Sequence, residues 1–92
     1  MPSSLHEARA AIINDILFAA SQTEVIRIIE TALKALSKKN IEESEVEHFI
    51  QDTITELNLF SPINKDALQW SNINMGRIYL NRIKNKISHT IN

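Results

Sequence analysis

The sequence contains no cysteine, which excludes disulfides, thiol catalysis and cysteine-ligated metal sites. This absence also fits a reducing compartment. Nowhere do about 18 apolar residues follow one another, so the sequence predicts no membrane span. Residues 1–7 are short and polar and lack the basic start and apolar run of a signal peptide. We therefore expect a cytoplasmic protein without a membrane partner.

Glycine and proline are also scarce, with one Gly and two Pro in 92 residues. Such a chain has little from which to build hairpin turns, so helices with short connections are expected. One glycine cannot form a phosphate-cradling loop, and the sequence has no Gly-x-Ser-x-Gly or zincin motif. Aromatic residues make up only 5% of the chain. We therefore expect no enzyme activity and no cofactor.

What the chain does have is apolar residues repeating at helical spacing. Ser4 and Ser21 are each followed three residues later by Glu, the capping-box spacing that starts a helix. Asn40 follows two lysines and suits the turn after a helix, and Ser61-Pro62 is typical of an N-cap followed by the first helical residue. The predicted helices cover residues 4–20, 21–37, 41–58 and 62–88.

The last predicted helix is the longest and has two weak points. Ser71-Asn72 could break it, and Gly76 has low helix propensity. After that point Ile73, Gly76, Leu80 and further isoleucines form a packing seam. The fold prediction is therefore all-α: a single domain over residues 1–92, built as an up-and-down four-helix bundle with its longest helix last.

Charge is unevenly distributed along the chain. Residues 40–60 contain six acidic residues and neither Lys nor Arg, whereas residues 61–92 contain five basic residues and one acidic residue. The two segments could complement each other within the fold or across a dimer. The spacing Glu45-x-x-His48 resembles a metal motif of helical bundles, but the apolar stripe through Val46 and Phe49 directs His48 towards solvent. We expect no metal site.

Three apolar residues lie away from the main stripe of their helices, namely Phe18, Met75 and Ile78. Several such residues in a small chain favour an interface over isolated surface positions. The favoured prediction is a non-enzymatic protein-interaction or small regulatory module. It would form a homodimer or bind another protein through these three residues, and its acidic third helix would select a basic partner.

The alternative is a nucleic-acid-associated protein that uses the basic C-terminal helix. Its candidate contacts are Arg77, Arg82, Lys84 and Lys86. At helical spacing Arg77 and Lys84 lie on one flank of the packing seam. Arg82 and Lys86 lie on the far side of the helix. This spread weakens the case for a phosphate-binding stripe, so we place nucleic acid second among the possible partners.

Overall fold

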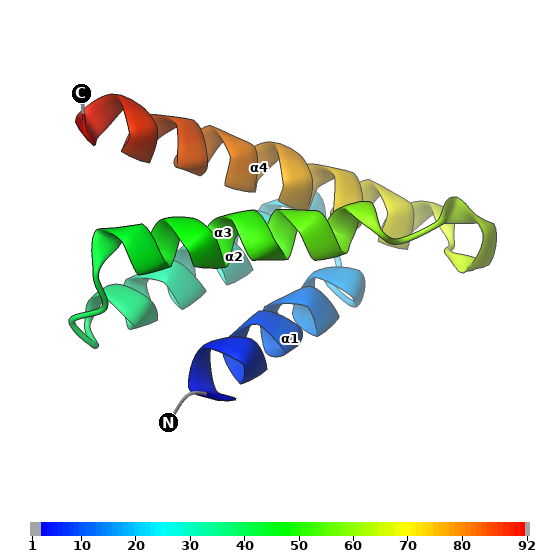
Figure 1. Ribbon diagram of the computed structural model, residues 1–92. Coiled ribbons are helices and arrows are strands. Elements are labelled where there is room, and N and C mark those ends of the chain that lie inside the picture. Colours follow the sequence, from blue (N-terminus) through cyan, green and yellow to red (C-terminus); the bar gives the residue numbers. More distant parts are fainter. Residues whose placement is uncertain (1–2, 92) are drawn as a thin grey trace.

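Four α-helices alternate in direction, so that both ends of the chain lie on the same side of the bundle (Figure 1). The computed structural model describes the backbone of residues 3–91 and the side chains of residues 5–87. The all-α, up-and-down bundle is confirmed, and no strand occurs within residues 3–91. The elements are α1 (Ser3–Leu17), α2 (Gln22–Ser37), α3 (Glu43–Asn58), the 3-10 turn η1 (Pro62–Asn64) and α4 (Ala67–Ile91). As predicted, the last helix is the longest, with 25 residues.

The centre of the core is the point where α1 and α3 meet α4. Ile16, Leu57 and Ile73 are completely buried there. A Cβ on Gly76 would lie 3.3 Å from Leu57 Cδ1 and 3.4 Å from Ile16 Cδ1, so glycine allows these helices to approach closely. The predicted seam of α4 therefore packs inwards, and Gly76 serves this packing rather than interrupting the helix.

The predicted boundaries of α2 are confirmed by its caps. The Ser21 side chain accepts a hydrogen bond from the N–H of Glu24, and Asn40 has a φ of 59°, the left-handed conformation that Asn tolerates. The boundaries of α1 differ from the prediction, because the helix already includes Ser3 and ends at Leu17. The side chain of Ser4 lies outside the described residues.

The predicted start of the last helix at Pro62 is wrong. Ser61 caps only the short turn η1, where its hydroxyl accepts from the N–H two residues later. Asp66 is the residue that starts α4: its carboxylate accepts from the N–H of Gln69 at 2.7 Å, and Gln69 Oε1 accepts from the N–H of Asp66 at 3.4 Å. This reciprocal pair is a capping box, and its Asp-x-x-Gln spacing is visible in the sequence.

The predicted break at Ser71-Asn72 is also wrong, because α4 is continuous through both residues. Asn72 is completely buried, and its Nδ2 donates to the Ala19 carbonyl at 2.9 Å. Ser71 Oγ accepts from Gln22 Nε2 at 2.8 Å. The two polar side chains therefore bond the α1–α2 connection at Ala19 and the first residue of α2, instead of competing with their own helix.

The contact between α2 and α4 includes the only tyrosine of the chain. Tyr79 donates its hydroxyl to the Glu30 carboxylate. This hydrogen bond, together with desolvation and the negative charge of Glu30, raises the pKa of Tyr79 above its ordinary value of 10.0.

Replacing Asn72 by alanine should destabilise the fold by about 1–3 kcal/mol, because the buried Ala19 carbonyl loses its donor. Urea unfolding measures the change. Asn81→Ala is the matched control, since Asn81 is exposed on the same helix and its side chain, among the described residues, bonds the Arg77 carbonyl alone. The exchange of Asn for Ala raises the helix propensity equally in both variants. Equal stability of the two would contradict a structural role for Asn72.

Removing the Glu30 charge should lower the pKa of Tyr79 towards its ordinary value. Because the folded pKa is raised, the Tyr79–Glu30 contact stabilises the fold below pH 10.0 and is lost as the pH rises through the folded pKa. Alkaline titration of tyrosinate absorbance should give a lower midpoint for Glu30→Gln than for the unmodified protein. Glu43→Gln, an exposed change on α3, should leave the midpoint where it was; a shift of equal size there would refute the assignment.

Candidate functional site

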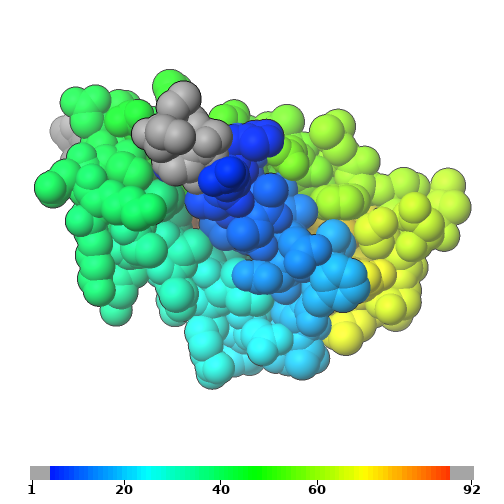
Figure 2. Space-filling view, turned by 90° about the horizontal axis from the view of Figure 1, so that it is seen from below, coloured from blue at the N-terminus to red at the C-terminus, as the bar shows by residue number. Residues whose placement is uncertain are grey.

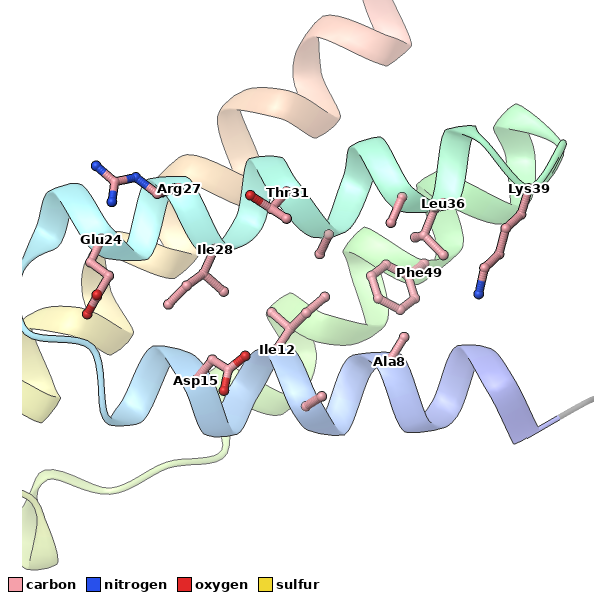
Figure 3. A pocket seen from close by; sticks show the side chains of 13 residues that line it. Ala8, Ile12, Asp15, Glu24, Arg27, Ile28, Thr31, Leu36, Lys39 and Phe49 are labelled. Atoms are coloured by element: carbon pink, nitrogen blue, oxygen red, sulfur yellow. The ribbon is translucent and has the colours of Figure 1, made fainter.

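An open groove of 440 Å³ runs between α1 and α2, with Phe49 of α3 at its floor (Figure 3). Ile12 of α1 and Ile28 of α2 face each other across it, and Leu36 lies beside Phe49. Protein pockets that bind ligands typically have about 300–1,000 Å³. We call this feature the α1–α2 groove.

Small side chains explain why the groove is open. Four alanines line it, two from each helix, and their methyl groups do not fill the space between the helices. They are Ala8 and Ala11 of α1 and Ala32 and Ala35 of α2. Ala11 and Ala35 are exposed, so the groove opens to solvent along its length. On the face seen from below, α1 and α2 both reach the surface (Figure 2).

Charged residues stand at both ends of the apolar floor. Asp15 and Glu24 lie at the end next to the α1–α2 connection, and Lys39 lies at the other end (Figure 3). Arg27 also borders the first end, but its side chain extends away from the groove. The site therefore combines an apolar centre with an acidic end and a basic end.

A second, smaller hollow of 170 Å³ lies between α1 and α3 and contains Arg9. Arg9 Nε donates to Glu56 Oε1 at 2.7 Å, and its Nη1 lies 3.8 Å from an Asp52 oxygen. Nη2 also donates to His6 Nδ1 at 2.9 Å. The Arg9 contacts with Glu56 and Asp52 therefore join α1 to α3 beside this hollow.

The structure exposes two of the three predicted interface residues. Phe18 is 72% exposed and Ile78 is 53% exposed, whereas Met75 is partly buried against the core. The prediction omitted three further exposed apolar residues near the α3–α4 connection, Leu59, Ile63 and Leu68. Their signal in the sequence was weak, because two of them lie outside any regular α-helix.

The predicted basic contacts are partly engaged within the fold. Arg77 donates to Asn58 and to Asn74, and Lys84 donates to Gln51 of α3. Arg82 and Lys86 are exposed. The four cations therefore do not all point to solvent as one phosphate-binding stripe.

The described residues offer no group of three or more His, Asp or Glu side chains that could hold a metal ion. His48 is exposed on α3, as its position in the stripe predicted. Within residues 3–91, no helix combines the length and the apolar character needed to cross a membrane.

No family model, curated protein or solved structure matches this chain. Its candidate site is consequently defined by geometry: an apolar groove with charged ends. Nothing in the sequence pattern predicted this groove, because its four alanines have the spacing of any helix. Alanine spacing alone does not reveal how far apart two helices lie.

The predicted self-association has a direct test at Phe18 and Ile78. Light scattering on a size-exclusion column should give a mass above the 10.5 kDa of one chain, because two exposed apolar side chains gain from burial. The double variant Phe18→Ser, Ile78→Ser should run as a monomer. The control variant Leu59→Ser, Ile63→Ser removes two apolar residues that are still more exposed, at 79% and 92%, and lie outside the predicted interface. Unchanged mass in the first variant would refute the interface.

Proposed function

We propose that this protein is a non-enzymatic interaction module that binds a segment of a partner protein in the α1–α2 groove. The observation that carries the proposal is the open apolar floor of Ile12, Ile28 and Phe49 between two helices. Ile12 and Phe49 are almost completely buried at the bottom of the groove, so a partner would contact chiefly Ile28 and the alanine methyl groups above them. Within the same proposal the protein acts in the cytoplasm, since a chain without cysteine needs no oxidising compartment.

The lining supports binding rather than catalysis. Neither histidine nor cysteine is among the described residues around the groove, and Thr31 is the one hydroxyl there. Thr31 is exposed on α2, and the carboxylates and cations stand at the ends rather than around it. A nucleophile needs a base within hydrogen-bond reach, and this lining offers Thr31 no imidazole.

Nucleic-acid binding has less support from the contacts. Arg77 and Lys84 already donate to side chains of α3, so phosphate would have to replace these hydrogen bonds. The groove itself has carboxylates at one end, which phosphate groups would avoid. A protein partner fits both the apolar floor and the charged ends of the groove better than a nucleic acid does.

Blocking the groove should weaken binding of an amphipathic peptide about 15 residues long, close to the span from Glu24 to Lys39 that lines the groove. Ala11→Arg places a long cation in the groove and should weaken binding about tenfold or more, as measured by fluorescence anisotropy. The neighbouring change Ala10→Arg is the matched control, because Ala10 is exposed on α1 and does not line the groove. Equal affinities of the two variants would overturn the groove as the binding site.

A further inference from the structure

We infer that the bound segment is an amphipathic helix with carboxylates in its first turn and cations in its last, lying antiparallel to α2. This inference rests on the proposed function and identifies the partner by its chemistry.

The shape of the groove suits a helix. Its floor is a strip of apolar side chains framed by α1 and α2, and the exposed Ala11 and Ala35 leave its upper side open. Helices commonly bind such grooves by inserting residues of one apolar face. A third helix resting on two others repeats the packing found within the bundle itself.

Charge complementarity then restricts the order of residues along the partner. Asp15 and Lys39 stand at opposite ends, and neither side chain makes a hydrogen bond or ion pair with another residue that the structure describes. Glu24 adds a second carboxylate at the Asp15 end, where it accepts from the Ala20 N–H. A partner cation therefore fits beside Asp15 and a partner carboxylate beside Lys39.

The helix dipole supplies the direction. Carboxylates stabilise the N-terminal turn of a helix, and cations stabilise its C-terminal turn. A partner helix with carboxylates in its first turn and cations in its last turn pairs with both ends of the groove when it begins beside Lys39 and ends beside Asp15. Because α2 runs from Glu24 towards Lys39, this partner lies antiparallel to α2 and parallel to α1.

The test uses two synthetic peptides with the same composition and the same apolar stripe. The forward peptide has Glu in its first turn and Lys in its last turn, and the reverse peptide exchanges them. The forward peptide should bind about fivefold more tightly, since exposed ion pairs each contribute a modest amount. The difference should shrink as salt is added.

A charge-exchanged protein separates groove recognition from the helicity of the peptides themselves. Asp15→Lys combined with Lys39→Glu should reverse the preference, and circular dichroism checks that these exposed changes leave the fold intact. Lys38→Glu, an exposed neighbour that does not line the groove, should keep the forward preference. An unchanged preference in the charge-exchanged protein overturns the inferred orientation but leaves the groove as the site. Failure of both peptides to bind, or equal binding to Ala11→Arg, overturns the proposed function.

Discussion

The close approach of α1 and α3 to α4 at Gly76 is the constraint on which the rest of the structure depends. Ile16 and Leu57 pack against the position that a side chain would otherwise occupy. The same long helix holds α2 through Tyr79–Glu30 and Ser71–Gln22. Since α1 and α2 are each anchored on α4, they need not close fully on each other. The alanines between them then leave the α1–α2 groove open.

The architecture could be predicted from the sequence because its determinants are local. Scarce glycine, apolar spacing and the Ser21 N-cap define most of the bundle, and the Asn40 turn follows the same rules. The failures arose where tertiary contacts overrode local preference. Asn72 has low helix propensity, yet a bond to the Ala19 carbonyl keeps it inside α4. The start of α4 was misplaced because Ser61-Pro62 resembles a helix start more strongly than Asp66 does.

The candidate site could be predicted only in part. Helical spacing was sufficient to show that Phe18 and Ile78 lie outside the core. It failed for Met75, since a long flexible side chain can reach the core from the edge of a stripe. The groove had no sequence signal of its own. It depends on the distance between α1 and α2, and that distance is determined by contacts with α4 from residues far apart in the chain.

The two halves of α1 are held by different forces. Ile12, Ile13 and Ile16 anchor its C-terminal half in the core, whereas Arg9 ties its N-terminal half to Glu56 and Asp52 of α3. The half of α1 that contains Ala8 is held by these partly exposed ion pairs and by the partly buried Leu5 and Ala8, and such contacts yield at lower free-energy cost than buried isoleucines. The Ala8 end of the groove is therefore held less rigidly than the end beside Ile12 and Ile16. We therefore expect a bulky partner side chain to be accommodated more readily at the Ala8 end of the groove.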